Sequence, residues 1–155
     1  MTHSNKIPTL LLQGLLKGYS LQNLKWILNQ AHLETGHFSS RIFRELNSPF
    51  GMSCVRSRKT TQIGCENLSD GNTAGVYSSK WSAINDRFLW DEEFDIDPRS
   101  NNYAKEVSKS YHPSSTYEAS VTNTRADLHG GFGLLSWVLV FAPLPILALV
   151  VYLIK

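Results

Sequence analysis

One carboxylate stands among apolar and small residues in a stretch that can do acid–base chemistry. In the segment NQAHLETGHFSS, residues 29–40, Glu34 is the only acidic residue. A carboxyl group held away from water has a raised pKa, because burial disfavours its ionised form, and it can then act as a general acid. The alternative is a solvated carboxylate at the frayed end of a helix that stops at Gly36. The spacing of the neighbouring residues leaves both alternatives open.

The element that must position Glu34 is a helix that we expect to begin after Ser20. The Ser20 side chain is a suitable N-cap. The apolar residues that follow recur at intervals of three and four, at Leu24, Ile27, Leu28 and Ala31. Side chains at these intervals lie on one face of a helix. Glu34 continues the series, so the spacing directs it toward the buried face or its edge.

Further helices and a small sheet are expected before residue 128. Apolar spacing predicts helices at residues 9–19, 80–94, 101–111 and 115–128, the second with Ser79 as its N-cap. Its predicted buried face carries Trp81, Ile84, Phe88 and Leu89. Residues 50–77 lose the helical period and are rich in Ser, Thr, Gly and Asn, which predicts a β-hairpin lobe with a turn at 56–60 and a second turn or loop at 69–75. The predicted fold class is mainly α (α+β) with this small lobe.

The composition fits one domain of ordinary size, with 155 residues, 42% hydrophobic and 18% charged. A net charge of +2, from scattered Lys and Arg, argues against nucleic acid as a partner. The two cysteines, Cys54 and Cys65, are too few for a zinc site. They can form a disulfide, which would stabilise the fold by about 3 kcal/mol in the chain-entropy model, or remain as two reduced thiols.

The last part of the chain is strongly apolar. Residues 132–154, FGLLSWVLVFAPLPILALVVYLI, contain no charged side chain. As a helix, this segment would be about 34 Å long, enough to cross the hydrocarbon core of a bilayer. We therefore predict a domain at 1–128, a Gly hinge at 129–131 and one C-terminal transmembrane helix at 132–154, with a buried core helix as the alternative. A single-pass membrane protein would have the lipid bilayer as a partner.

The residues around and after Glu34 form an ordered series. They are Gln30, Ala31, Glu34, Thr35, Gly36, Ser39 or Ser40, Ile42, Phe43, Asn47, Phe50, Gly51 and Met52. This series resembles the glucosaminidase domains of bacterial and phage peptidoglycan hydrolases, whose pattern is Gln-Ala-x-x-Glu-Ser/Thr-Gly, then Ser, Leu/Ile-Phe and Asn-Asn-x-Phe-Gly-Met/Ile. The chain departs from the pattern at Ser48-Pro49, where the family has its second Asn.

Two later segments carry the same resemblance. Residues Tyr77, Ser78, Ser82, Asp86 and Trp90 resemble the family's helix that begins with Tyr and ends with Asp and Trp. Tyr111 and Tyr117 are similar to the late Tyr-Ala-x-Asp-x-x-Tyr element, with His112-Pro113 in place of its Ala-Thr. The resemblance covers roughly residues 20–125 and implies a lysozyme-like fold.

The resemblance also implies a substrate and roles for named residues. The substrate would be peptidoglycan, cleaved at the β-1,4 linkage between N-acetylglucosamine and N-acetylmuramic acid. Glu34 would be the general acid, and Glu66, favoured over Asp70, would be the second carboxylate; the alternative for both Glu66 and Asp70 is a solvated loop acid. Tyr111 would assist at the catalytic site, and substrate-binding roles fall to Phe50, Tyr77 and Tyr117, with core packing as the alternative. No metal or other cofactor is expected.

The leading hypothesis is therefore a membrane-anchored peptidoglycan hydrolase of the N-acetylglucosaminidase type, used in cell-wall lysis or phage genome entry. One alternative is a lytic transglycosylase on the same fold. Another is a structural or wall-binding virion membrane protein that has lost turnover. An anchored wall hydrolase fits a phage that contains a membrane, so the expected location is the internal virion membrane or the host cell envelope. The catalytic domain would act in the periplasm, with other virion proteins as further partners.

Overall fold

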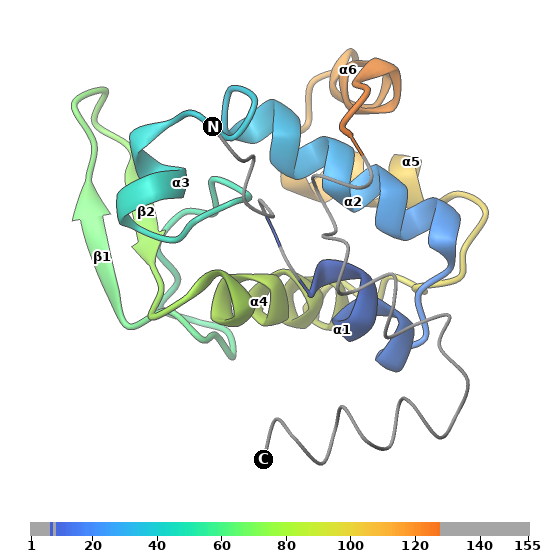
Figure 1. Ribbon diagram of the computed structural model, residues 1–155, viewed down its shortest axis with the longest axis horizontal. Helices are drawn as coiled ribbons and strands as arrows, with labels where there is room; N and C mark the ends of the chain where they lie inside the picture. The colour runs from blue at the N-terminus through green and yellow to red at the C-terminus, as the bar shows by residue number, and fades with distance from the viewer. Residues whose placement is uncertain (1–6, 8, 128–155) are drawn as a thin grey trace.

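Most of the described chain is helical. The computed structural model describes residue 7 and residues 9–127. In chain order these residues form α1 (Leu10–Leu16), α2 (Leu21–Glu34), α3 (Arg41–Glu45), β1 (Gly64–Asn67), β2 (Thr73–Val76), α4 (Lys80–Glu93), α5 (Tyr103–Tyr111) and α6 (Tyr117–Asn123). The hairpin and α3 lie at one end of the molecule, and the longer helices lie beside them (Figure 1).

Helix α2 is the central element and begins and packs as its sequence predicts. The Ser20 hydroxyl accepts a hydrogen bond from the backbone N–H of Asn23 at 3.2 Å, which confirms the N-cap. All four residues of the predicted apolar face are fully buried: Leu24, Ile27, Leu28 and Ala31. The helix contacts α1, α5 and α6. A Cβ at Gly14 of α1 would lie 2.1 Å from Leu24 Cδ2, so only glycine permits this close approach of the two helices.

Helix α4 packs against α1 and carries the second predicted stripe. The Ser79 hydroxyl accepts from the backbone N–H of Ser82 at 3.2 Å, again as predicted. Ile84 and Phe88 are fully buried, but Trp81 is 51% exposed and does not belong to the buried face. Trp81 stands in the first turn of the helix, where the spacing of apolar residues alone does not distinguish the core from its edge.

The β-hairpin is present, but its turn is not at residues 56–60, the first of the two predicted positions. The strands pair antiparallel, with Gly64 opposite Val76 and Asn67 opposite Thr73. The turn spans residues 68–72, where the Leu68 N–H donates to the Asn72 carbonyl at 2.8 Å, and Gly71 has a φ of +83°, a conformation natural to glycine. The hairpin turn predicted at 56–60 is wrong, because that segment precedes both strands and forms a bend outside the hairpin.

Helix α3 was not predicted. It has five residues and begins at a cap in which the Ser40 hydroxyl accepts from the backbone N–H of Phe43 at 3.3 Å. Five residues are too few to establish an apolar period, so only the cap residue gives a signal in the sequence.

The fold class needs one correction, at the predicted transmembrane helix. No helix in residue 7 and residues 9–127 is long and apolar enough to cross a membrane. The longest, α2 and α4, have 14 residues each, or about 21 Å against a hydrocarbon core of about 30 Å. The predicted hinge at 129–131 and helix at 132–154 lie outside the described residues. The fold class is corrected to an α+β domain, and the single-pass membrane localisation is corrected with it.

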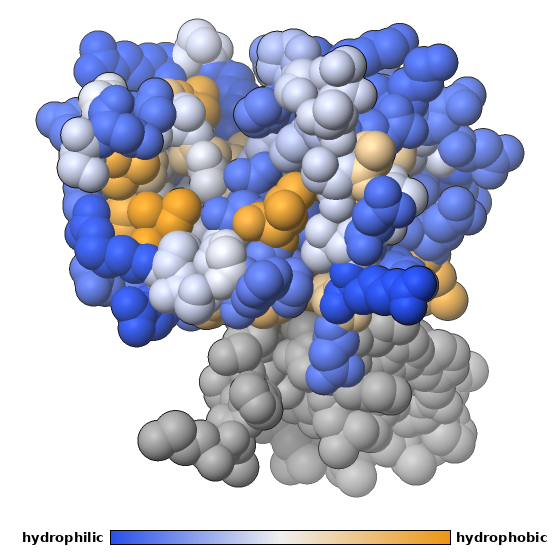
Figure 2. Space-filling model, turned by 90° about the horizontal axis from the view of Figure 1, so that it is seen from above, coloured by the Kyte–Doolittle hydropathy of each residue, from blue (hydrophilic) through white to orange (hydrophobic). Residues whose placement is uncertain are grey.

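The face shown in Figure 2 is mostly hydrophilic. Its apolar side chains form small patches that hydrophilic side chains separate. Among the coloured residues of this face there is no single broad apolar surface.

Candidate catalytic site

Glu34 is the last residue of α2, and the chain turns sharply after it. The Thr35 hydroxyl donates to the Ala31 carbonyl at 2.6 Å and accepts from the Phe38 N–H at 2.9 Å, which closes the helix end. Gly36, His37 and Phe38 then all have positive φ, between 52° and 62°. For residues other than glycine this left-handed conformation is strained. The strained turn fixes the direction in which the chain leaves Glu34.

The Glu34 carboxyl is partly buried, and burial is the main influence on its acidity. Burial raises its pKa above the usual value. A hydrogen bond from Tyr117 and the positive charge that His112 can carry act in the opposite direction, without cancelling the effect of burial. A carboxyl in such surroundings keeps its proton to a higher pH than a solvated one, which is the property a general acid requires.

Tyr117 is the direct partner of Glu34. Its hydroxyl, at the start of α6, donates to Glu34 Oε1 and accepts from the side-chain amide of Gln30 at 3.1 Å. Gln30 lies one helical turn before Glu34 on α2. Burial and the nearby Glu34 charge raise the pKa of Tyr117 far above its usual value, so its hydroxyl remains a donor.

The second oxygen of Glu34 faces Gly51. A Cβ at position 51 would lie 3.3 Å from Glu34 Oε2, so the missing side chain leaves room beside this oxygen. Gly51 has a φ of +62°, a conformation that glycine adopts without strain. Both the conformation and the space favour glycine here.

Tyr111 and Phe50 complete the surroundings of Glu34. The Tyr111 ring stacks on Tyr117, with ring centroids 6.2 Å apart and planes at 14°, and its hydroxyl donates to the Phe50 carbonyl. The Phe50 side chain itself is 1% exposed. In this structure Phe50 therefore offers a carbonyl acceptor and core packing, and its ring is not open to a sugar.

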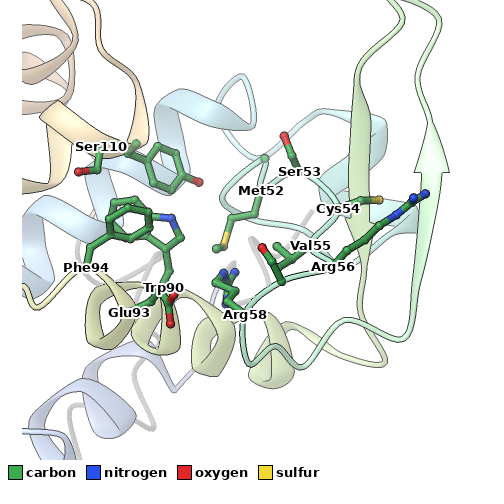
Figure 3. A pocket seen from close by; sticks show the side chains of 13 residues that line it. Met52, Ser53, Cys54, Val55, Arg56, Arg58, Trp90, Glu93, Phe94 and Ser110 are labelled. Carbon is green, nitrogen blue, oxygen red and sulfur yellow. The ribbon is translucent and has the colours of Figure 1, made fainter.

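A cavity of about 380 Å³ lies beside this group, with Gly51 and Tyr111 in its lining. On one side stand Trp90 and Phe94, whose ring centroids are 4.5 Å apart, and across from them stand Met52 and Arg58 (Figure 3). Phe94 is 47% exposed, so part of its side chain is in contact with solvent. Flat apolar rings with polar groups nearby are suited to a sugar ring.

The two acids proposed as second carboxylate lie in the hairpin. Glu66, on β1, is ion-paired with Arg41 at the start of α3. Asp70 is in the exposed hairpin turn and accepts from the Asn72 backbone and side chain, each at 3.0 Å, which lowers its pKa. Neither has a hydrogen bond to Glu34 among the described residues. Around Glu34 the structure brings together Tyr111 and Tyr117, while Glu66 is engaged by Arg41 in a partly exposed ion pair.

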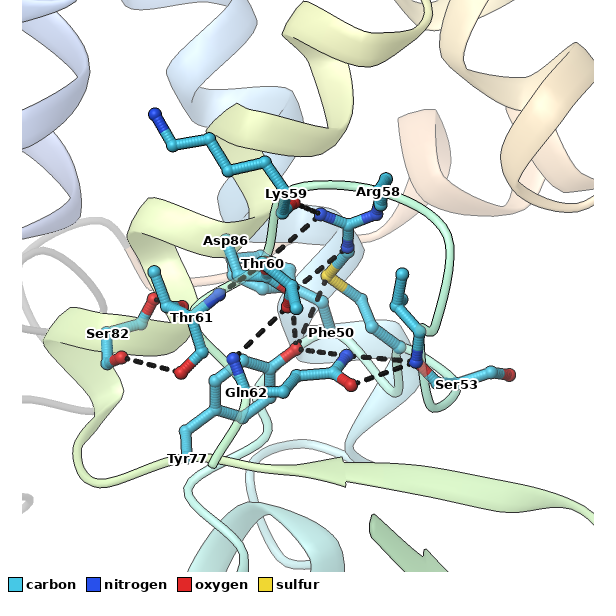
Figure 4. A network of polar contacts seen from close by, with 12 residues as sticks. Phe50, Ser53, Arg58, Lys59, Thr60, Thr61, Gln62, Tyr77, Ser82 and Asp86 are labelled. Atoms are coloured by element: carbon cyan, nitrogen blue, oxygen red, sulfur yellow. Dashed lines mark hydrogen bonds and ion pairs between the residues drawn. The ribbon is translucent and has the colours of Figure 1, made fainter. Parts of the chain in front are cut away.

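Tyr77 belongs to a different network, centred on Asp86 of α4 (Figure 4). Its hydroxyl donates to Asp86 Oδ2 at 2.8 Å, and its ring is 2% exposed. Arg58 donates to both Asp86 oxygens, at 3.1 and 3.0 Å, and the Thr61 N–H donates at 3.1 Å. Burial alone would raise the pKa of Asp86, but the hydrogen bonds from Arg58, Thr60 and Tyr77 outweigh it and lower the pKa. This network fastens residues 58–62, beside the cavity, to α4.

Cys54 and Cys65 form a disulfide, with Cα atoms 5.5 Å apart. The bridge ties the segment after Met52 to β1. Strand β2 is also attached to this segment, because the Gly75 N–H donates to the Met52 carbonyl at 2.9 Å. The cavity wall and the hairpin are thus joined covalently and by hydrogen bonds.

Several residues around the site were not singled out for a role from the sequence. They are Gln30, Arg58, Arg87, Phe94 and His112, whose ring stacks on Tyr117 at 4.9 Å. Gln30 carried a usable signal, since it precedes Glu34 by four residues and shares its helix face. Within residues 7 and 9–127, no group of three or more His, Cys, Asp or Glu side chains is placed to hold a metal ion.

Comparison with known proteins gives one likeness of fold. No protein-family model matches the chain, and no curated protein matches it in sequence. A solved structure of a type VI secretion system effector–immunity complex from Pseudomonas protegens is similar, with a TM-score of 0.51 and 18% sequence identity. The match covers 64% of this chain and 71% of that chain. At this identity the likeness shows the fold alone.

Proposed function

We propose that this protein is a glycoside hydrolase that cleaves the β-1,4 linkage of peptidoglycan glycan strands, of the N-acetylglucosaminidase type, with Glu34 as the general acid. The observation that carries the proposal is the state of Glu34: a partly buried carboxyl with a raised pKa at a helix end, one oxygen held by Tyr117 and the other directed to Gly51. The ordered resemblance around Glu34 supplies the substrate class.

The chemistry needs one proton at one place. As the bond from the anomeric carbon to the glycosidic oxygen breaks, its electron pair stays on that oxygen, which is a poor leaving group unless it is protonated. Glu34 supplies the proton. A water molecule adds its hydroxyl to the anomeric carbon and gives its other proton to a second basic group. The rings of Trp90 and Phe94 in the cavity wall support a sugar-binding role there.

The test is lysis of purified peptidoglycan by the wild-type protein and by Glu34→Gln. The substitution keeps the size of the side chain and removes the acid, so we expect lysis to fall at least about 100-fold while the far-UV circular dichroism stays that of the wild type. Glu92→Gln is the matched control, because Glu92 is in an exposed ion pair with Lys17 and should not affect lysis. Undiminished lysis by Glu34→Gln would rule out the mechanism.

A lytic transglycosylase on the same fold is the second candidate. It needs a single carboxylate, which acts first as acid and then as base, and it is favoured by the ion pair that engages Glu66 with Arg41. Mass spectrometry of the products separates the two reactions. Reducing N-acetylglucosamine ends support the hydrolase, and anhydromuramyl ends support the transglycosylase. In the hydrolase, Glu66 remains the proposed second carboxylate, and Glu66→Gln should then lower kcat with little change in KM.

We also propose a protein partner. The similar solved structure is an effector–immunity complex, in which one protein is bound to another. For this chain, a protein that covers the cavity beside Gly51 would keep substrate from Glu34. Affinity purification with the Glu34→Gln variant as bait should yield a protein that lowers lysis by the wild type, and a bait that captures no inhibiting protein would contradict this part of the proposal.

A further inference from the structure

A chain of buried hydrogen bonds ends on Glu34. Arg87 Nε, on α4, donates to Gln30 Oε1 at 3.0 Å, and Gln30 Nε2 donates to the Tyr117 hydroxyl oxygen at 3.1 Å. The Tyr117 hydroxyl then donates to Glu34 Oε1. Gln30 and Arg87 are both 0% exposed, so water does not compete for their hydrogen bonds.

The direction of this chain is decided at its buried end. A guanidinium group has only N–H donors, so the Gln30 atom that meets Arg87 must be the amide oxygen. The amide nitrogen is then the atom that meets Tyr117, and it can only donate. The Tyr117 oxygen therefore accepts from Gln30, and its single hydrogen is left for Glu34.

The anchor of the chain is itself held in place. Arg87 is ion-paired with Asp91, one helical turn further along α4, and it also donates to the Tyr103 hydroxyl at 3.2 Å. Asp91 in turn accepts from the Tyr19 hydroxyl at 2.7 Å. Turning the guanidinium away would leave a buried charge unpaired, which is strongly unfavourable. The donors of Arg87 are thus presented to Gln30 in one orientation.

The two oxygens of Glu34 are made unequal as a result. Oε1 accepts the Tyr117 hydrogen, and it is a stronger acceptor as the carbonyl oxygen of the acid than as its hydroxyl oxygen, so this hydrogen bond favours the acid proton on Oε2. Oε2 has no hydrogen-bond partner among the described residues and lies beside Gly51. Gly51 lines the cavity, and Glu34 stands behind it, outside the lining. We propose that Gln30 and Arg87 are positioning residues that keep the acid proton of Glu34 on Oε2. The proposal rests on the proposed function, in which this proton passes to the leaving glycosidic oxygen.

Three titratable side chains face Glu34 from the elements packed against it: Tyr111 at the end of α5, His112 after it, and Tyr117 of α6. Burial raises the pKa of both tyrosines well above the usual value, so both remain protonated. A positive charge on His112 lowers the pKa of Glu34. His112 is therefore left unchanged in every variant, so that a shift reports the hydrogen-bond chain.

The decisive variant is Gln30→Glu. A carboxylate keeps an acceptor for Arg87 but offers Tyr117 a second acceptor in place of the amide donor. The Tyr117 hydroxyl should then turn toward residue 30, and Oε1 of Glu34 loses its donor and can hold the proton in place of Oε2. We expect the pKa of Glu34 to rise, the basic limb of the pH profile to move upward, and kcat to fall about tenfold or more with KM unchanged.

The matched control is Asn29→Asp, on the same helix. Asn29 is also buried, and its side-chain oxygen accepts from the Ala126 N–H at 3.2 Å, so the change from amide to acid likewise keeps the acceptor. It should leave the pKa of Glu34 and the pH profile unchanged. Tyr117→Phe, which removes the donor itself, should raise the pKa of Glu34, and adding Gln30→Glu to it should produce a smaller further rise than Gln30→Glu alone, because only the direct repulsion by the new charge remains.

Carbon-13 NMR titration of the Glu34 carboxyl measures its pKa without substrate and without activity. The proposal is supported if the pKa of Glu34 rises in Gln30→Glu and in Tyr117→Phe, if the two rises are not additive in the double variant, and if the pKa is unchanged in Asn29→Asp. These results would support it even if no lysis were detected. An absence of lysis would count against the proposed function alone. A folded Gln30→Glu variant in which Glu34 has its wild-type pKa overturns the proposal. The proposal is also overturned if the pKa shifts of the two single variants simply add in the double variant, or if Asn29→Asp shifts the pKa of Glu34 as much as Gln30→Glu does.

Discussion

At the scale of single residues, Glu34 differs from the other acids near it in its surroundings. Glu66 is ion-paired with Arg41, and Asp70 is held by Asn72 in an exposed turn. The Glu34 carboxyl is partly buried, its Oε1 accepts a hydrogen bond from a tyrosine, and a glycine lies beside its Oε2. A carboxyl that keeps its proton and presents it in one direction is suited to donating it.

Gly51→Ala tests the space beside Oε2. The new methyl group would lie 3.3 Å from Glu34 Oε2 in a backbone conformation with φ of +62°. We expect a loss of about 1–2 kcal/mol in the free energy of unfolding from the backbone strain, and a fall of at least about tenfold in the rate of peptidoglycan lysis from the displaced carboxyl.

Gly71→Ala is the control for this prediction. Gly71 has a φ of +83°, and a Cβ there would meet no atom within 4 Å. The Gly71→Ala variant should lose about as much free energy of unfolding as Gly51→Ala, measured by urea denaturation, while its lysis rate stays that of the wild type. Equal lysis by the two variants would mean that the methyl at position 51 does not disturb Glu34.

At the scale of elements, the cavity depends on how residues 53–62 are fastened. This segment has no regular secondary structure, so its backbone groups must find partners elsewhere. The Gln62 side chain accepts from the Val55 N–H at 3.0 Å and donates to the Ser53 carbonyl at 3.0 Å. With the Arg58–Asp86 pair and the disulfide, these bonds hold the wall of the cavity that faces Trp90 and Phe94 (Figures 3 and 4).

Asp86→Asn should weaken this attachment strongly. The Arg58 side chain is 7% exposed and that of Asp86 is 0% exposed, so the substitution leaves a nearly buried guanidinium without its counter-ion. We expect the free energy of unfolding to fall by about 3–5 kcal/mol, measured by urea denaturation at neutral pH. Asp70→Asn, in the exposed hairpin turn, is the control and should cost about 1 kcal/mol or less. A loss in Asp86→Asn no larger than in the control would show that the ion pair does not hold the segment.

At the scale of the whole molecule, the state of Glu34 links the proposed activity to stability. The folded state holds the Glu34 proton more tightly than the unfolded chain, because the folded pKa is raised above 4.5. Between these two pKa values the folded state binds more protons, so the free energy of unfolding falls as the pH rises through this window. Asp86, with a lowered pKa, acts in the opposite sense, and its stabilisation is lost as the pH falls below 3.8.

Glu34→Gln should therefore change the pH dependence of stability as well as the activity. The amide does not ionise, so the fall in stability above pH 4.5 that comes from Glu34 should be absent. The difference in Tm between variant and wild type should become more favourable to the variant from about pH 4 to about pH 7, measured by calorimetry. A constant difference over this range would contradict a raised pKa for Glu34.

Much of the helical framework could be predicted from the sequence, because its causes are local. The caps at Ser20 and Ser79 and the buried stripe of α2 follow from side-chain chemistry and spacing within one helix. The hairpin turn predicted at 56–60 could not be judged locally, because Asp86, from a distant part of the chain, holds the Arg58 side chain of that segment. The predicted transmembrane helix rested on hydropathy and length alone, and no helix of residues 7 and 9–127 is long and apolar enough to cross a membrane.

For the site itself, the sequence placed Glu34 near the end of a helix and in line with its buried face, because spacing along one helix decides which side chains share a face, but it left open whether the carboxyl is buried or solvated. Only the tertiary structure decided what surrounds it. The hydrogen bond from Tyr117 joins residues 83 positions apart, and that from Arg87 to Gln30 joins residues 57 apart. Hydrogen bonds between distant segments depend on which helices pack together, and the apolar period of one helix shows its buried face but not the helix that covers it.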